Sequence, residues 1–283
     1  PPGRATMGFT WRCCSGRDKE TRIKEEKKDR MLSEYIERFF TKSGRYFLML
    51  RKAMARPQRG RVFARLYLRE VDDLGFNSMG IVAFISFFVG AVVALQMAFN
   101  LEGSTMIPKH YVAYATREAV ILEFSPTIIA IILCGKIGSY IASSIGTMRV
   151  TEQIEALDVM GVNSINYLVL PKIAALLSFM PVLIMTSMVT ALFGGWVAVI
   201  TSGVATTAEY VNGLRMPFNT FYVAYAMIKS EGFAFVIETL PAFFGYYIKG
   251  GALEVGKAST NAVVWSSIVI IILNYVLTQT LLG

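Results

Sequence analysis

Long apolar stretches alternate with short polar ones through most of this 283-residue chain. No charged residue occurs between Asp73 and Glu102, between Lys172 and Glu209, or after Lys257. Each of these gaps exceeds the ~20 apolar residues that a helix needs to cross the hydrocarbon core of a bilayer. The pattern predicts an all-α, polytopic membrane protein with five transmembrane helices. We expect them at about 77–99, 119–145, 173–200, 218–248 and 261–282, the fourth being interrupted at residues 229–232.

The polar segment 146–161 separates the second and third apolar stretches. Val150, Ile154 and Leu157 recur at helical spacing, which predicts one short helix with a narrow apolar stripe. Arg149 and Glu152 are three residues apart, close enough to pair on that helix, and Gly161 is expected to end it. A helix of about 14 residues is roughly 20 Å long, too short and here too charged to span a bilayer. It either rests on the membrane surface or docks a soluble partner.

Small residues form two adjacent rows on the expected second span. Rows of this kind allow another helix to approach backbone to backbone, which is a common packing device in membranes. The rows are Gly135, Ser139 and Ser143, and beside them Gly138, Ala142 and Gly146.

The composition agrees with a membrane protein, because 54% of the residues are hydrophobic and only 17% are charged. The positive charge is concentrated before the first span, where residues 1–76 carry a net +9. A basic flank ahead of a span favours a cytoplasmic N-terminus and contact with anionic lipid, so we discard nucleic acid as a partner. Residues 1–30 are charged and lack periodicity, which predicts disorder. Residues 31–76 mix aromatic and basic side chains, as expected for an interfacial amphipathic region.

The chain offers no convincing site for a cofactor or a metal. Residues 251–257 match the opening of a nucleotide-binding loop, G-x-x-x-x-G-K. The next residue, Ala258, has no hydroxyl for Mg²⁺, and an apolar span rather than a β-strand precedes the motif. The three cysteines and the single His110 lack the spacing of a metal site. We therefore expect no cofactor in this chain.

Five charged residues fall within the expected spans, and one of them, Glu231, belongs to the interruption of the fourth span. A charge at the centre of a bilayer costs roughly 2.5–3.5 kcal/mol on insertion scales, so such residues usually face a cavity or a partner. Glu123 and Lys229 are both expected at the depth of the outer leaflet, where they either pair or reach separately to the interface. Glu238 lies deeper in the fourth span, and Lys136 is expected to face protein rather than lipid.

Several motifs in order resemble the MlaE/YrbE-type permeases, the membrane subunits of MCE-associated ABC transporters. They are GTMRVTEQIEALDVMGVN with YLVLPK, LEFSP, the Ile228-Lys229-Ser230 element, GYYIKGGALEVGKAST and NAVVWSS. The likeness covers about residues 70–283. Ser125 stands where the family has Gly, Ser144 where it often has Glu, and Asn274 where it often has Asp. Proposals that rely on those acidic groups are therefore in doubt for this chain.

The resemblance implies a homodimeric permease domain, 77–283, in a bacterial inner membrane. It implies a cytoplasmic ATPase that binds ATP and Mg²⁺, an MCE-domain protein on the periplasmic side, and lipid, usually phospholipid, as cargo. The chain itself would be a transport subunit and not an enzyme. By position, the ATPase-coupling helix would comprise Arg149, Glu152, Gln153, Glu155 and Asp158. The lipid cavity would be lined by Leu95, Gln96, Phe99, Glu123 and Lys229.

Two other functions fit the same residues in part. An ion-coupled secondary transporter would use Glu123, Lys229 and Glu238 as a relay, but it should show an internal repeat, and none is evident in the sequence. A membrane scaffold without transport activity would leave the intramembrane charges without a role.

Overall fold

The computed structural model describes residues 37, 40–54, 60–102 and 108–282. It divides into two compact units, one ending at Arg51 and the other running from Lys52 to the C-terminus. In the first unit, residues 40–51 are helical. The predicted disordered segment 1–30 lies outside the described residues, as does most of the stretch 31–39. The architecture of the second unit is given below.

Helices account for every regular element that the structure describes in the second unit, which confirms the predicted all-α class there. The first helical run joins α2 (Gly60–Glu70), the π-helical η1 (Val71–Phe76) and α3 (Asn77–Glu102). The basic segment before the first span is thus continuous with the span itself. The interfacial role expected for residues 31–76 stays a prediction.

The second helical run extends from His110 to Val150. It comprises α4 (His110–Ala119), η2 (Val120–Ile128), α5 (Ile129–Leu133), η3 (Cys134–Gly138) and α6 (Ser139–Val150). The π-helical η2 contains Pro126, which has no backbone N–H to donate, and wide turns of this kind accommodate such a break in the hydrogen-bond ladder.

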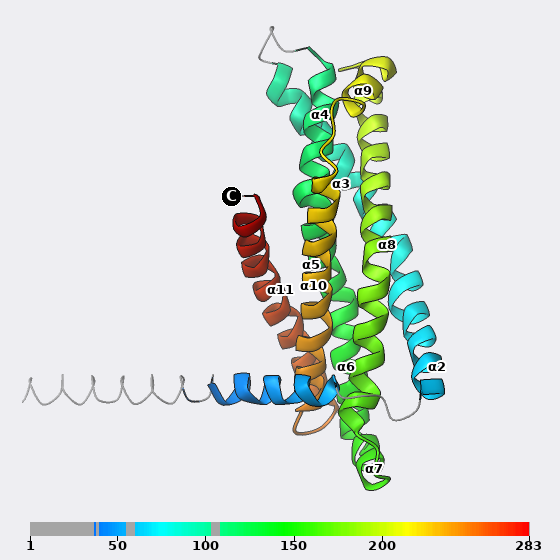
Figure 1. Ribbon diagram of the computed structural model, residues 1–283, viewed down its shortest axis with the longest axis vertical. Coiled ribbons are helices and arrows are strands. Elements are labelled where there is room, and N and C mark those ends of the chain that lie inside the picture. The colour runs from blue at the N-terminus through cyan, green and yellow to red at the C-terminus, as the bar shows by residue number, and fades with distance from the viewer. Residues whose placement is uncertain (1–36, 38–39, 55–59, 103–107, 283) are drawn as a thin grey trace, which may run out of the picture. The chain divides into compact units, whose positions relative to one another are not determined.

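The remaining helices are α7 (Gln153–Val159), α8 (Ser164–Thr201), α9 (Thr207–Leu214), α10 (Phe221–Tyr246) and α11 (Ala252–Leu282). Helices α4 and α9 lie at one end of this unit and α7 at the other (Figure 1), and we refer to the α9 end and the α7 end below. Helix α10 continues without a break through the polar residues 229–232 and through Pro241, which interrupt its apolar sequence. Lys229 is paired with a residue of η2, whereas the carboxylate oxygens of Glu238 have no hydrogen-bond partner among the described residues.

Among the described residues, four helical runs are long and apolar enough to cross a membrane. They are Gly60–Leu101, His110–Val150, Ser164–Thr201 and Ala252–Leu281. Helix α10 has 26 residues but carries Lys229, Glu231 and Glu238, so its composition alone does not mark it as a span. The count of five spans stays a prediction.

Helices α3 and α8 cross in backbone contact. A Cβ atom added to Gly90 would lie 1.9 Å from the carbonyl oxygen of Ala191, and one added to Gly194 would lie 2.0 Å from that of Phe87. Only glycine permits such an approach, which maximises dispersion contacts where lipid provides no hydrophobic driving force between helices. This crossing fixes α3 on α8.

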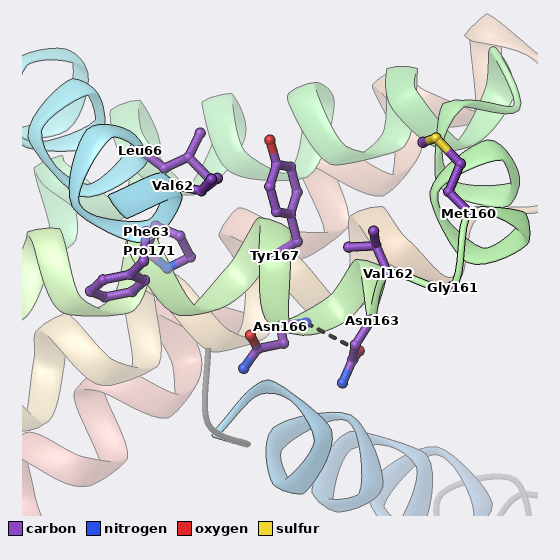
Figure 2. A pocket seen from close by; sticks show the side chains of 10 residues that line it. All are labelled: Val62, Phe63, Leu66, Met160, Gly161, Val162, Asn163, Asn166, Tyr167 and Pro171. Carbon is purple, nitrogen blue, oxygen red and sulfur yellow. Dashed lines mark hydrogen bonds between the residues drawn. The ribbon is translucent and has the colours of Figure 1, made fainter. Parts of the chain in front are cut away.

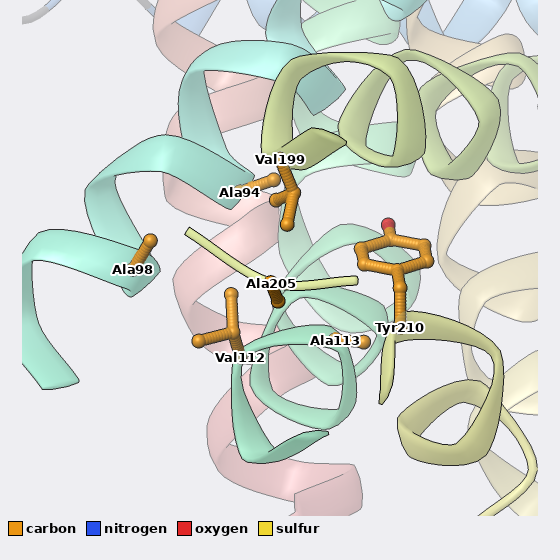
Figure 3. Packing of buried hydrophobic residues seen from close by; sticks show 7 residues of the cluster. All are labelled: Ala94, Ala98, Val112, Ala113, Val199, Ala205 and Tyr210. Carbon is orange, nitrogen blue, oxygen red and sulfur yellow. The ribbon is translucent and has the colours of Figure 1, made fainter. Parts of the chain in front are cut away.

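At the α9 end, small side chains from α3, α4 and α8 pack beneath α9 (Figure 3). The buried cluster consists of Ala94, Ala98, Val112, Ala113, Val199, Ala205 and Tyr210. The Tyr210 hydroxyl donates to the Leu192 carbonyl at 3.2 Å, and burial raises the pKa of this phenol to about 12. The predicted loop 201–217 therefore contains a helix that is anchored on the bundle.

Candidate functional site

An ion pair joins η2 to α10. The Lys229 ammonium lies 2.8 Å from a carboxylate oxygen of Glu123. The lysine side chain is fully buried, whereas that of Glu123 is 40% exposed. Of the two interpretations left open by the sequence, the structure thus shows pairing. A buried ammonium is tolerated only with a close counter-charge and further hydrogen bonds.

Hydroxyl and amide groups complete the surroundings of this pair. Lys229 also donates to the hydroxyls of Tyr225 at 3.0 Å and Thr278 at 3.2 Å. Thr278 and the Asn274 amide donate to the two Glu123 oxygens at 3.1 and 3.4 Å. These five side chains, from η2, α10 and α11, form what we call the polar network.

Two members of the polar network, Tyr225 and Thr278, were not anticipated from the sequence. A local signal existed, because Tyr225 precedes Lys229 by four residues and Thr278 follows Asn274 by four residues, so each pair shares one helix face. Asn274 is the position where the resemblance leads one to expect Asp. Its amide supplies a donor where a carboxylate would place a second negative charge beside Glu123.

The other residues expected at a lipid cavity lie on α3 toward the α9 end. Gln96 and Phe99 are exposed and Leu95 is half-buried. Within the part of the chain that the structure describes, no hydrogen bond or ion pair connects these three residues to the polar network. Their grouping with Glu123 and Lys229 in one cavity stays a prediction.

The polar segment 146–161 is not one helix, which corrects the prediction. Helix α6 runs on to Val150, the chain turns at Thr151 and Glu152, and α7 then occupies seven residues. Glu152 adopts a left-handed conformation with φ 59°, so its side chain cannot stack one turn from Arg149. The ion pair predicted between Arg149 and Glu152 is replaced by one between Arg149 and Glu155 at 2.9 Å.

We call residues 151–160, which include α7, the tip. Ile154 is buried beneath it, and the Arg149 guanidinium lies 5.8 Å from the centre of the Tyr246 ring. Gln153 and Asp158 are exposed, and so are the apolar side chains of Val159 and Met160, at 88% and 68%. Gly161, with φ +75°, ends the tip as the sequence predicts.

The second predicted row of small residues packs against α10 and the residues that follow α10 in the same chain. A Cβ on Gly138 would meet Pro241 at 3.2 Å, and one on Gly146 would meet Ile248 at 2.5 Å. Between them, the Ala142 carbonyl lies against Gly245.

The first row lies differently. Gly135 has open space where a Cβ would stand, and Ser143 donates to the Tyr140 carbonyl of its own helix. The Ser139 carbonyl accepts a hydrogen bond from Ser259 of α11 at 3.2 Å. Lys136, between the rows, donates to the Asn77 carbonyl of α3 and so faces protein.

A cavity of about 470 Å³ opens beside the tip, between α2 and the start of α8 (Figure 2). Its lining is mainly apolar and comprises Val62, Phe63, Leu66, Met160, Gly161, Val162, Asn163, Asn166, Tyr167 and Pro171. Asn163 caps α8 by accepting from the Asn166 N–H at 3.3 Å, and the Asn166 amide donates to the Ala53 carbonyl. Across the described residues, no group of three ligands is suited to a metal ion.

The sequence was compared with known proteins. Residues 67–280 match the family described as Permease MlaE. A probable ABC transporter permease protein of Rickettsia bellii is 32% identical over 241 residues, which is 83% of this chain and 90% of the relative. One of Synechocystis is 31% identical over 220 residues, 77% of this chain and 82% of the relative.

A plant relative is more distant. The chloroplastic protein TRIGALACTOSYLDIACYLGLYCEROL 1 of Arabidopsis thaliana is 28% identical over 235 residues, 81% of this chain and 65% of the relative. The family match covers far more than half of the chain and includes the polar network and the tip. An ion-coupled secondary transporter is not favoured by these relatives. The chain belongs to the MlaE family of ABC transporter permeases.

Proposed function

We propose that this chain is the permease subunit of an ABC transporter that moves phospholipid or a related lipid between the two membranes of a bacterial envelope. An ABC transporter permease works with a partner ATPase, which would supply ATP hydrolysis. In our proposal two copies of the chain span the inner membrane with cytoplasmic N-termini. A pair of ATPases docks on the tip, and a periplasmic MCE-domain protein receives or delivers the lipid.

The observation that carries the coupling role is the shape of the tip. It is short and projects beyond α6 and α8, and Val159 and Met160 expose apolar side chains at its end. Exposed apolar side chains flanked by polar ones are typical of a protein contact. The Arg149–Glu155 pair and buried Ile154 hold the tip on the bundle. A push on the tip would therefore be transmitted to α6 and, through the glycine contacts, to α10.

Lipid as cargo rests on the family and on the polar network. The name of the Arabidopsis relative contains that of a galactolipid. In this chain, the 40% exposed carboxylate of Glu123 gives the otherwise apolar helices one polar edge, which suits an amphiphile with a headgroup and acyl chains. Leu95, Gln96 and Phe99 would contact the acyl chains at the entrance to the cavity.

The docking role is tested by co-purification of this chain with the ABC ATPase of the same organism. We expect Val159→Asp with Met160→Asp to abolish co-purification, because the exposed apolar contact is lost while Ile154 and the ion pair remain. Arg215→Glu, an exposed charge reversal near α9, serves as the matched control and should co-purify normally. Full ATPase recovery with the double variant would overturn the assignment of the tip.

A further inference from the structure

Glu238 is a buried carboxyl group without a hydrogen-bond donor. It lies on α10 in the half toward the α7 end, and only 1% of the residue is exposed. Neither of its carboxylate oxygens has a hydrogen-bond partner among the described residues. An ionised carboxylate in such surroundings is strongly disfavoured, and the group takes up a proton instead.

Two charges that act on Glu238 form an ion pair with each other. Lys172 of α8 lies 2.6 Å from a carboxylate oxygen of Glu70 on α2, with side-chain exposures of 6% and 15%. Both charges act on Glu238, the lysine favouring its ionised form and Glu70 opposing it. The second oxygen of Glu70 is also buried and has no hydrogen-bond partner within the described residues. The cluster thus holds two carboxyl groups and one ammonium.

Within the described part of the chain, the other elements packed on α10 supply no further cation to Glu238. On α6, Tyr140 offers the face of its ring to Lys172, with Nζ 5.5 Å from the ring centre. On η3, Lys136 donates to the Asn77 carbonyl. On η2, Glu123 is paired with Lys229, and α11 carries no charge after Lys257. The remaining charged group of α10, Glu231, is a carboxyl group too.

We propose that Glu238 is a proton-binding site whose occupancy is set by which carboxylate Lys172 pairs with. In the conformation seen here Lys172 pairs with Glu70, and Glu238 is the neutral acid. If α2 draws Glu70 away from α8, Lys172 neutralises Glu238 instead. The Glu238 O–H bond then breaks, its electron pair stays on the carboxylate, and one proton leaves to water. The protonation state of Glu238 would thus depend on the position of α2 relative to α8 and α10. This inference does not depend on the identity of the cargo.

Infrared spectroscopy tests the site in the full chain within its purified complex in lipid vesicles. At neutral pH we expect a carbonyl band of a protonated carboxylic acid that disappears in Glu238→Gln. Glu70→Gln should also remove the band, because Lys172 is then free to ionise Glu238. Glu254→Gln, at an exposed pair with Lys257, is the control and should leave the band unchanged.

The wild-type chain allows a second infrared measurement that needs no substitution. Labelling glutamate with ¹³C at the side-chain carboxyl should shift the acid band. Absence of a shifted band at neutral pH would show that no glutamic acid is protonated, and the proposal would fail. It would fail equally if the band survived Glu238→Gln, or if Glu70→Gln left it at full strength.

Discussion

The fully buried ammonium of Lys229 is the residue-scale feature on which the polar network depends. Its partner Glu123 is partly exposed and keeps donors from Asn274 and Thr278. Lys229 and Glu123 therefore differ in the hydrogen-bond partners and solvent contact that each keeps when the other is removed. Without Glu123 the lysine is a buried cation with only uncharged acceptors, namely two hydroxyls and the Leu122 carbonyl. Without Lys229 the carboxylate still has donors and solvent.

Substitution of either partner should expose this asymmetry. We expect Glu123→Leu to lower the free energy of unfolding by about 3–5 kcal/mol, because it leaves an uncompensated buried charge. Lys229→Met should cost less, roughly 1.5–3 kcal/mol, in line with losing hydrogen bonds to a charged group. Thermal unfolding of the purified chain in detergent measures both. Equal losses, or a larger loss for Lys229→Met, would contradict this account of the network.

At this scale the sequence identified the charges but not all of their neighbours. Glu123, Lys229 and Glu238 stand out because each interrupts an apolar helix. Pairing of Glu123 with Lys229 was one of two open alternatives, since 106 residues separate them and only the packing of η2 on α10 brings them together. Tyr225 and Thr278 were missed for the same reason, because their role depends on how α10 and α11 are rotated about their axes.

At the scale of elements, the left-handed turn at Glu152 defines the tip. The sequence predicted the helical stripe and the stop at Gly161 but not the break, because Thr151 and Glu152 carry no turn signal. A non-glycine residue in the left-handed region costs about 1–2 kcal/mol, so packing of the tip must compensate for the strain. Buried Ile154 and the Arg149–Glu155 pair are the contacts that do so.

Position 152 should therefore accept glycine and reject β-branched residues. Glu152→Gly removes the steric strain and is expected to keep α7 protected from hydrogen exchange at wild-type level or better. Glu152→Val places a branched side chain in the left-handed region and should increase exchange over residues 153–159. If the valine variant protected α7 as well as the glycine variant does, the strained turn would not control the tip.

Helix α9 shows how one exposed carboxylate contributes to an element. Hydrogen bonds from the Thr206 backbone N–H and hydroxyl lower the pKa of Glu209 below its usual 4.5, and the reciprocal bond completes a capping box. Because the folded-state pKa is depressed, the stabilisation is fully present above pH 4.5 and is lost as the pH falls through the folded value.

We expect hydrogen exchange at residues 206–210, corrected for the intrinsic rate, to increase as the pH falls below 4.5. In Glu209→Gln the same amides should show no such dependence on pH. A step of equal size in the glutamine variant would assign the effect to another group.

For the whole molecule, the helical class and most segment positions follow from the sequence, because long charge-free stretches have few alternatives in a membrane. The sequence did not show that 60–102 and 110–150 are each one continuous helical run. The spans were placed by their apolar residues, and these helices extend beyond their apolar residues. Nor did the sequence settle the pairing of Lys229 on α10 with Glu123, because this pairing depends on how α10 packs on η2. The α3–α8 glycine crossing likewise depends on contacts between distant segments.

For the molecule as a whole, this helix packing couples the tip to the polar network. The tip continues α6, whose Ala142 carbonyl lies against Gly245 of α10, and α10 carries Lys229 to Glu123. Helix contacts this close move as rigid bodies rather than deform. An ATP-driven movement at the tip would therefore reach the polar network.

Transfer of labelled phospholipid between vesicles, with the complete complex reconstituted in one population, tests the central claim most directly. We predict lipid movement that requires ATP and is lost when Val159→Asp and Met160→Asp uncouple the tip, with Arg215→Glu behaving as wild type. Lipid movement at the same rate without ATP, or unaffected by the tip variant, would contradict the account.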